Sequence, residues 1–302
     1  MHLKELSFAT LLKTAPGTSV QDLGRMGQAR YGIPVSGAMD ERSMTWTNHL
    51  LKNPAEAAVL EISQPGFLIQ FGAQTTISIA GAKAEIRLNG LEIPHLALVP
   101  IHPNDLLEIG AFRSGARVYL GIRHGFQTEE VLGSRSFYEG VTTEKSLRKG
   151  STLAFFSESE RHQPVFAKVK ENGAWLETKE LTAYPGPDFG LLPKKTATEL
   201  LSKTFTVSPL SNRMGIQLEE LLENQLPELP TNPVYPGTVQ LTSGGKLILL
   251  ARDAQVTGGY PRILQLTPES ESVLAQKRPG DSISFRLIHA KLRHSFSEKS
   301  RN

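Results

Sequence analysis

Short runs in which apolar and polar residues alternate recur along the chain, and they restrict its fold more than any other feature. These runs cover residues 67–71, 75–80, 84–88, 117–122, 238–241, 246–251 and 282–288. A period of two places every second side chain on the same face of a strand. The 26 glycines and 19 prolines fall largely between the runs, where tight turns need them. The pattern predicts a mainly β chain, built as a barrel or a sandwich, with few short helices.

Helix signals are confined to two places. Asp40 is a good N-cap for a helix that runs to about Leu51, and Asn53-Pro54 stops it there. A shorter helix is expected over residues 194–201. Elsewhere turns dominate, and Asn89-Gly90 is the residue pair typical of a type I′ β-hairpin.

A chain of 302 residues has room for one large domain or two ordinary ones. The segment 157–180 is polar and charged, as linkers between domains are. We expect an N-terminal β-barrel unit with an inserted helix in residues 1–165 and a C-terminal β-barrel unit in residues 180–290. Residues 291–302 are expected to form a polar tail.

Composition excludes several classes of protein and chemistry. Cysteine is absent, so the chain holds no disulfide, thiolate zinc site, iron–sulfur cluster or cysteine nucleophile. The 33 Lys and Arg nearly balance the 30 Asp and Glu, which does not favour nucleic acid as a partner. The first residues lack the features of a secretory signal, and polar residues break the charge-free run 62–82 into strand-like pieces. We therefore expect a cytoplasmic protein that does not enter a membrane.

The sequence also lacks the motifs of common cofactor sites. Lys149-Gly150-Ser151-Thr152 has the residue types of a phosphate-binding loop in the wrong order, so no ATP site is evident in this chain. No Met-Lys-Met tripeptide is present to carry covalent biotin. His95 and His102 have no acidic neighbour at a convincing ligand spacing, so no bound metal is expected.

Polar clusters that contain glycine hold the candidate site residues. They occupy residues 20–40, 133–136, 211–215 and 235–261. In the first, Asp22 and Arg25 are candidates for an ion pair that holds the loop, and Ser36 precedes a helix whose amino end favours an anion. Taken singly, the clusters are better explained as ordinary turns.

Taken together and in order, the clusters resemble one family. The matching stretches are VQDLGRMG, GIPVSGAMD, AAVLEI, GSRS, YPGPD, SNRMG, PGTVQL and DAQVTGGYP. They are similar to the C subunit of 5-oxoprolinase, also described as KipA-like or allophanate hydrolase subunit 2, which is related to the carboxyltransferase part of urea carboxylase. The resemblance covers nearly the whole chain. One departure is Arg123-His124-Gly125, which stands where the family usually has Gly-Gly.

This resemblance implies a fold, a reaction and partners. The implied fold is a cyclophilin-like β-barrel architecture with two related barrel units. The implied reaction is the ATP-dependent opening of 5-oxoproline to L-glutamate, carried out with a KipI-like B subunit and a separate A subunit. ATP would be used by this complex, at a site that the present chain does not show.

The resemblance also leads us to expect an active site shared with the KipI-like partner. Asp22 and Asp253 are candidates for the catalytic base or for orienting an arginine, and Asn212 is a candidate donor to a developing oxyanion. An arginine suits the substrate carboxylate because its planar group binds both oxygens. The substrate-binding candidates are arginine, amide, hydroxyl and glycine positions of the same clusters: Arg25, Ser36, Arg135, Arg213, Gln240, Thr257, Gly258, Gly259 and Tyr260.

Two alternatives from other functional classes stay open. One is a KipA-like regulatory protein that binds a KipI-like inhibitor of a histidine kinase. The other is a carboxyltransferase component related to urea carboxylase, which would take carboxylated biotin from another protein. Supplying the chain and its partners with ATP and 5-oxoproline separates these hypotheses, because only the hydrolase predicts glutamate.

Overall fold

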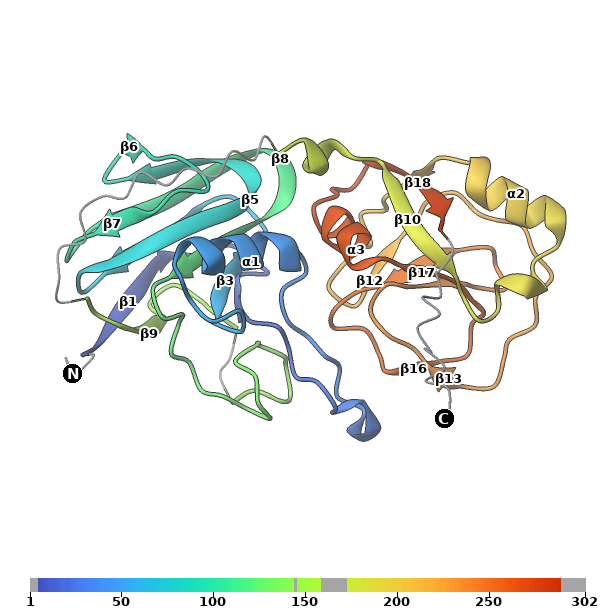
Figure 1. Cartoon of the computed structure of the whole chain (residues 1–302), viewed down its shortest axis with the longest axis horizontal. Coiled ribbons are helices and arrows are strands. Elements are labelled where there is room, and N and C mark those ends of the chain that lie inside the picture. Colours follow the sequence, from blue (N-terminus) through green and yellow to red (C-terminus); the bar gives the residue numbers. More distant parts are fainter. Residues whose placement is uncertain (1–4, 144–145, 159–172, 289–302) are drawn as a thin grey trace, which may run out of the picture.

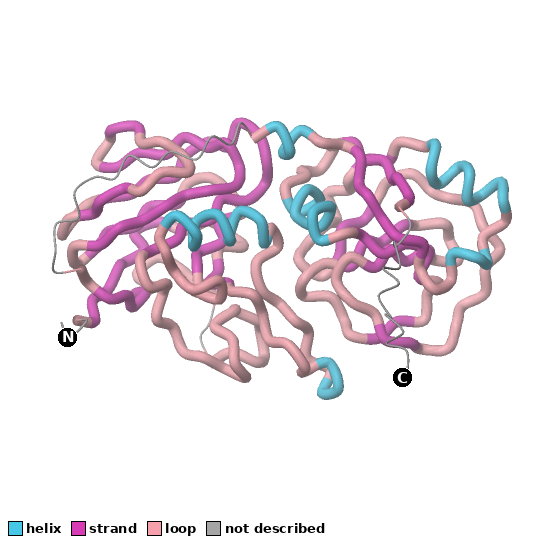
Figure 2. The backbone as a smooth tube through the Cα atoms, in the orientation of Figure 1, coloured by secondary structure: helices cyan, strands magenta, loops and turns pink. Residues whose placement is uncertain are grey.

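The structure is a computed structural model, and it describes residues 5–143, 146–158 and 173–288. Two main sheets lie side by side and give the molecule two lobes, the first blue to green and the second yellow to red in Figure 1. Strands and loops make up most of both lobes, and the helices are short (Figure 2). The expected mainly β fold is therefore confirmed.

The elements of the two lobes follow one another along the chain. The first lobe contains β1 (Leu6–Lys13), β2 (Ser19–Gln21), η1 (Ala29–Tyr31), α1 (Glu41–Leu50), β3 (Val59–Ile62), β4 (Phe67–Phe71), β5 (Thr75–Leu88), β6 (Leu91–Glu92), β7 (Val99–Ile101), β8 (Leu106–Ile122) and β9 (Thr152–Phe156). After η2 (Ala174–Glu177), the second lobe contains β10 (Glu180–Pro185), η3 (Phe189–Leu191), α2 (Lys194–Ser202), β11 (Phe205–Thr206), β12 (Gly215–Gln217), β13 (Asn232–Pro233), β14 (Thr238–Leu241), β15 (Leu247–Leu250), β16 (Thr257–Gly258), β17 (Arg262–Leu266), α3 (Pro268–Ala275) and β18 (Ser282–Leu287).

The sheet of the first lobe is antiparallel. Its main path runs β2-β3-β8-β4-β1-β9, and β5 pairs with β8 and carries β6 and β7. Alternate side chains of these strands point inward and form one fully buried apolar core, which includes Phe67, Ile79 and Leu120. Burial of such side chains is the main source of this lobe's stability.

The runs at 75–80 and 84–88, which the sequence separates, form the single strand β5. Its pairing with β8 shifts register after Gly81 and again before Ile86, so the strand bends and continues. Gly81 has φ of +96°, and a Cβ there would overlap the carbonyl oxygen of Arg117. The hairpin at Asn89-Gly90 is confirmed, since both residues have positive φ between the paired strands β5 and β6.

The second lobe is built on a sheet in the order β11-β18-β10-β17-β14-β15-β12, with a separate two-stranded sheet of β13 and β16. Most neighbours are antiparallel, but β10 and β18 pair in parallel. A second apolar core lies against this sheet and includes Phe205, Val239 and Ile263.

Two of the three α-helices in the described residues match the sequence prediction. Helix α1 begins after Asp40, whose Oδ1 accepts a hydrogen bond from the backbone N–H of Ser43 at 3.0 Å, and α2 begins at Lys194. The sequence prediction missed α3, although Thr267 caps it and Pro268 stands in its first turn. The pattern of α3 was hidden because buried serines alternate with acidic residues in it.

Helices α1 and α3 face each other where the lobes meet, at the centre of Figure 1. The expected boundary segment 157–180 lies between the last strand of the first sheet and the first strand of the second, but residues 159–172 lie outside the described part, as does the tail 291–302. The exact domain limits therefore stay a prediction.

No helix within the described ranges is long and apolar enough to cross a membrane.

Candidate functional site

Glu61 lies at the junction of the two lobes and is completely buried. It comes from β3, a four-residue strand whose other members are Val59, Leu60 and Ile62. Its Oε1 accepts a hydrogen bond from Nη1 of Arg213 at 2.6 Å. A buried carboxylate is tolerated only where cations and donors compensate it, so its neighbours define the site.

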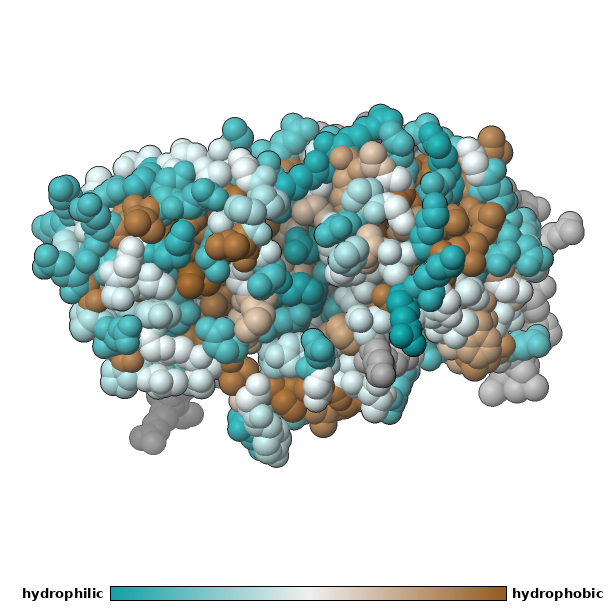
Figure 3. Space-filling view, turned by 180° about the vertical axis from the view of Figure 1, so that it is seen from behind, coloured by the Kyte–Doolittle hydropathy of each residue, from teal (hydrophilic) through white to brown (hydrophobic). Residues whose placement is uncertain are grey.

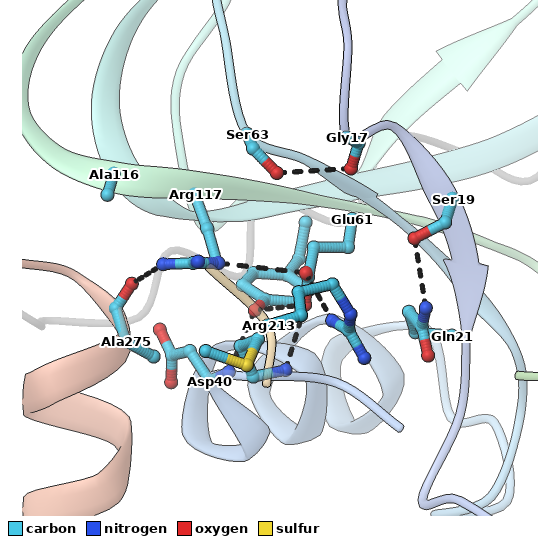
Figure 4. Close-up of polar contacts among 12 residues, drawn as sticks. Gly17, Ser19, Gln21, Asp40, Glu61, Ser63, Ala116, Arg117, Arg213 and Ala275 are labelled. Atoms are coloured by element: carbon cyan, nitrogen blue, oxygen red, sulfur yellow. Dashed lines mark hydrogen bonds and ion pairs between the residues drawn. The ribbon is translucent and has the colours of Figure 1, made fainter. Parts of the chain in front are cut away.

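Arg213 reaches Glu61 from the second lobe, from the turn before β12 (Figure 4). Its guanidinium binds Asp253 through two bonds, Nε to Oδ2 at 2.7 Å and Nη2 to Oδ1 at 3.0 Å. Nη2 also donates to the carbonyl of Gly37 at 2.7 Å. The side chain of Asn212 fixes this turn by accepting hydrogen bonds from the backbone N–H groups two and three residues further along the chain, at 2.7 and 3.2 Å. Arg213 thus joins two carboxylates and two lobes.

Arg117 and Gln276 form a second connection between the lobes. Arg117, on β8, donates from Nη1 to the carbonyl of Ala275 at the end of α3 (Figure 4). Gln276 accepts hydrogen bonds at Oε1 from the backbone N–H groups of Ala116 and Arg117, at 2.9 and 3.0 Å. Its Nε2 donates to Oδ2 of Asp40 at 2.6 Å. Both ends of this buried amide are therefore engaged across the junction.

Tyr119 links the carboxylate of Glu61 to the backbone of Asp40. Its hydroxyl donates to Glu61 Oε2 at 2.7 Å and accepts from the backbone N–H of Asp40 at 2.8 Å. Burial raises the pKa of Asp40 and the pKa of Tyr119 above their usual values. Burial alone would raise the pKa of Glu61 too, but the positive charges of Arg213 and Arg117 outweigh it and hold that pKa below its usual value. The site thus holds one carboxylate whose pKa is lowered beside another whose pKa is raised.

We call these side chains the junction cluster: Asp40, Glu61, Arg117, Tyr119, Arg213, Asp253 and Gln276. Seen from behind in Figure 3, the region between the lobes is largely hydrophilic.

Asp22 organises a second group beside the junction cluster. Its side chain accepts hydrogen bonds from the hydroxyls of Ser134 and Ser136, both at 2.6 Å, and from the backbone N–H of Arg135 at 2.6 Å. It also accepts from the backbone N–H of Gly24 at 2.8 Å. The expected ion pair with Arg25 is not formed; instead Asp22 ties its own loop to residues 134–136. These four donors hold the carboxylate of Asp22 in place within the loop.

Arg25 is almost fully buried, with 1% of its surface exposed. Its Nη2 donates to the carbonyl of Ser136, but Nε and Nη1 have no hydrogen-bond partner among the described residues. Burial lowers the pKa of Arg25, while the charges of Asp22 and Asp253 act in the opposite direction. The charge of Asp253, which binds Arg213, therefore also acts on Arg25, and two nitrogens of Arg25 remain available as hydrogen-bond donors.

Ser36 lies beside this group in a strained conformation. It has φ of 56° and is completely buried, and its hydroxyl has no partner among the described residues. Its backbone N–H donates to the carbonyl of Arg252 in the second lobe at 2.9 Å. A buried serine held at positive φ with a free hydroxyl is typical of functional sites rather than of simple turns.

Apart from Asp253, the candidates of the last cluster form a separate group in the second lobe. Gln240 is buried, and its Nε2 donates to the carbonyl of Tyr260 at 3.4 Å. A Cβ at Gly258 would come within 2.6 Å of that same Nε2, so glycine is needed for the amide to lie there. Thr257 and Tyr260 are exposed, and the carbonyl of Gly259 accepts from the backbone N–H of residue 229 at 2.7 Å.

The structure thus brings together six of the sequence candidates near the junction: Asp22, Arg25, Ser36, Arg135, Arg213 and Asp253. Asn212 is exposed and holds the turn that carries Arg213, and the group around Gln240 lies apart in the hydrogen-bond network. The roles of all these residues stay predictions.

Sequence reasoning missed five members of the junction cluster: Asp40, Glu61, Arg117, Tyr119 and Gln276. Asp40 was predicted only as the N-cap of α1. One signal was present, because a charged residue inside the apolar run Val59-Leu60-Glu61-Ile62 needs a buried partner. Among the residues that the structure describes, no three potential ligands gather to hold a metal ion.

Comparisons with known proteins agree with this architecture. A family model for the carboxyltransferase domain, subdomain A and B, matches residues 31–287. The chain is 30% identical to the C subunit of 5-oxoprolinase from Escherichia coli, over 91% of this chain and 89% of that protein. It is also 30% identical to urea amidolyase of Saccharomyces cerevisiae, over 90% of this chain but only 16% of that much longer protein.

Solved structures give the same picture. TTHA0988 superposes with a TM-score of 0.83 at 26% identity, over 95% of this chain and 57% of that chain. Urea amidolyase of K. lactis superposes with a TM-score of 0.81 at 24% identity, over 96% of this chain and 19% of that chain, which supports the fold. On the family match, which spans both lobes and the junction between them, the chain belongs to the family of the carboxyltransferase domain, subdomain A and B.

Proposed function

We propose that this chain is a subunit of a cytoplasmic, ATP-dependent 5-oxoprolinase complex that hydrolyses 5-oxo-L-proline to L-glutamate. The observation that carries the proposal is the match to the C subunit of the E. coli 5-oxoprolinase, because it runs over nearly the full length of both chains. The proposed partners are a KipI-like B subunit and a separate A subunit. In the reaction, the lactam C–N bond breaks, and water supplies the hydroxyl to the carbonyl carbon and a proton to the nitrogen.

We place the ATP site of this complex on one of the partner proteins. The only resemblance to a phosphate-binding loop in the sequence is the stretch from Lys149 to Thr152. Here Gly150 donates its backbone N–H to the carbonyl of Leu11, and the chain then enters β9. A phosphate-binding loop instead leads into a helix whose free N–H groups face the phosphates. These residues therefore do not fit that role.

Of the three candidate arginines, Arg25 is the one that we assign to the substrate carboxylate. The guanidinium of Arg213 already makes four hydrogen bonds, to two carboxylates and one carbonyl. Arg135 donates from Nη1 to the carbonyl of Thr128. Arg25 keeps two unpartnered nitrogens in a buried setting, where a bidentate bond to an anion has its greatest strength.

Asp253 and Ser36 complete the proposed site. Asp253 orients Arg213 through two hydrogen bonds, and its negative charge also acts on Arg25. It therefore offsets part of the positive charge next to the substrate. We assign the free hydroxyl of Ser36 as a donor to the developing oxyanion. In this assignment Asp22 holds the loop, and Glu61 holds Arg213.

Reconstitution with the A and B subunits tests the assignment. We expect Arg25→Met to raise KM for 5-oxoproline at least about tenfold in ATP-dependent glutamate formation, which corresponds to the loss of one charge-assisted hydrogen bond. Arg30→Met is the matched control, because Arg30 is exposed and stacks on Tyr31. Equal KM values for Arg25→Met and the unaltered chain would remove Arg25 from the substrate site.

A carboxyltransferase is the second candidate function. The family model and the relatives named urea amidolyase support it, since they share this domain. It predicts turnover only when a biotin carrier protein and a carboxylase supply carboxylated biotin. The regulatory hypothesis predicts a stable complex with the KipI-like protein and no glutamate. The same reconstituted mixture, assayed with and without these additions, distinguishes the three functions.

A further inference from the structure

Both tryptophans of the chain line one pocket in the first lobe. The chain contains 2 tryptophans, and Trp46 and Trp175 both face a cavity of about 180 Å³. Leu96 and Leu176 add apolar walls, and Lys83 and His95 are its titratable members. None of these residues belongs to the junction cluster or to the group around Asp22.

The pocket is built by elements that are distant in the sequence. Trp46 comes from α1, and Trp175 comes from η2, just before the second lobe. Leu96 has φ of 51°, and its backbone N–H donates to the carbonyl of Ile79 at 2.8 Å, which fixes the loop over β5. Gly81 forms part of the wall at the bend of β5. Because each wall is held by contacts outside the pocket, the cavity is preformed.

The cavity fits a small flat molecule. A volume of 180 Å³ corresponds to about six water molecules at roughly 30 Å³ each, which is the size of one substituted ring. Two indole rings and two leucines favour an aromatic ring over a flexible polar ligand. The guanidinium of Arg42 lies over the ring of Trp175, 4.9 Å from its centre, and Trp175 also packs against the second apolar core, so this indole is held in place.

Charge at the pocket selects an anion. Lys83 forms an ion pair with Glu177 at 3.4 Å, but both side chains are largely exposed, at 46% and 70%. Such a surface pair is weak and exchanges partners at little cost. His95 bonds the carbonyl of Ala84 through Nε2 at 3.0 Å, which fixes its ring at the rim. The ammonium of Lys83 is therefore available to a carboxylate that enters beside the indoles.

We propose that this pocket binds a single-ring aromatic carboxylate, with the ring between the walls of Trp46 and Trp175 and the carboxylate on Lys83. The pocket is connected to the junction cluster through Ser43. Ser43 lines the pocket, and its hydroxyl donates to Oδ2 of Asp40 at 2.5 Å. Asp40 in turn accepts from Gln276. An occupied pocket thus touches the helix that carries the contacts between the lobes.

Because both tryptophans line the pocket, their fluorescence can report binding to it. Full-length protein titrated with benzoate should show a saturable change in tryptophan fluorescence, and benzamide, which has the same shape without the charge, should bind at least about tenfold more weakly. Trp46→Phe should keep a response from Trp175 with a weakened affinity. Lys83→Met should weaken benzoate at least about tenfold and leave benzamide unchanged, whereas Lys13→Met, an exposed lysine on β1, should change neither.

Three outcomes would overturn the proposal. They are the absence of a saturable response to benzoate in the unaltered chain, benzamide binding as tightly as benzoate, and Lys83→Met behaving like Lys13→Met. Circular dichroism and the melting temperature of each variant establish that a lost response is not a loss of folding.

Discussion

Arg213→Met should destabilise the protein strongly, because it removes the cation between two carboxylates at the lobe junction. Glu61 is completely buried and binds Arg213 at 2.6 Å, while its other arginine, Arg117, is 3.6 Å away. Removing one partner of a buried ion pair costs about 3–5 kcal/mol, because the other charge is left without compensation. At about 2–4 °C per kcal/mol, the melting temperature should fall by about 6–20 °C. Methionine keeps an unbranched stem without the guanidinium, so the loss reports the charge and its hydrogen bonds more than packing of the stem.

A double-mutant cycle in urea, followed by fluorescence, measures this coupling. Glu61→Gln with Arg213→Met removes both charges, so the double variant should be more stable than the sum of the single losses predicts. Arg113→Met is the matched control, since Arg113 is 71% exposed and lies 3.6 Å from Glu85, and it should melt like the unaltered chain. A loss below about 1 kcal/mol for Arg213→Met, or strict additivity with Glu61→Gln, would refute the view that this pair joins the lobes.

Further predictions concern the loops, the second connection and pH. Gly24→Ala should destabilise the protein more than Gly27→Ala, since both residues have positive φ but only at Gly24 would a Cβ meet an atom, a carbonyl oxygen at 2.5 Å; urea unfolding compares the two. Gln276→Leu should cost about 1–3 kcal/mol, because it leaves the backbone N–H groups of Ala116 and Arg117 without a partner and removes one of the donors to Asp40, and a cost near zero in the same assay would contradict its bridging role. The pKa of Glu61 is lower in the folded chain than its usual 4.5, so the stabilising effect of its charge is present above about pH 4.5 and is lost as the pH falls further. In urea unfolding at a series of pH values, Glu61→Gln should therefore lose less stability on acidification than the unaltered chain does. Parallel curves of stability against pH for the two proteins would contradict this.

Much of the fold follows from local patterns in the sequence. Strand β14 and the hairpin at Asn89-Gly90 appear where alternation and turn residues predict them, and Asp40 starts α1 as expected. The course of β5 was not predictable, because a glycine at its bend reads as a break in the strand when its partner β8 is unknown. Helix α3 was hidden for a similar reason, since its buried serines accept hydrogen bonds from other elements, Ser270 from Thr182 on β10 and Ser272 from Arg42 on α1, and do not form an apolar stripe.

The candidate site was predicted only in part. Asp22, Arg25 and Asp253 stand in glycine-bearing clusters, which makes them candidates on sequence alone. Glu61 stands out as a charge inside an apolar run, but the sequence does not identify its partners, because they come from β8 and from the second lobe, more than fifty residues away in sequence. Whether an arginine keeps free N–H donors depends on the acceptors that it meets at the junction of the lobes. Spacing along the chain therefore does not distinguish Arg25 from Arg213.

The central proposal is that this chain serves a 5-oxoprolinase complex through Arg25. The most direct measurement is glutamate formation from 5-oxoproline by the chain with its A and B partners, with and without ATP. We expect glutamate only when all three proteins and ATP are present, and a strongly reduced rate at low 5-oxoproline with Arg25→Met but not with Arg30→Met. A stable, correctly assembled complex that forms no glutamate would contradict the proposed function, and glutamate formation that Arg25→Met leaves unchanged would contradict the assignment of the site.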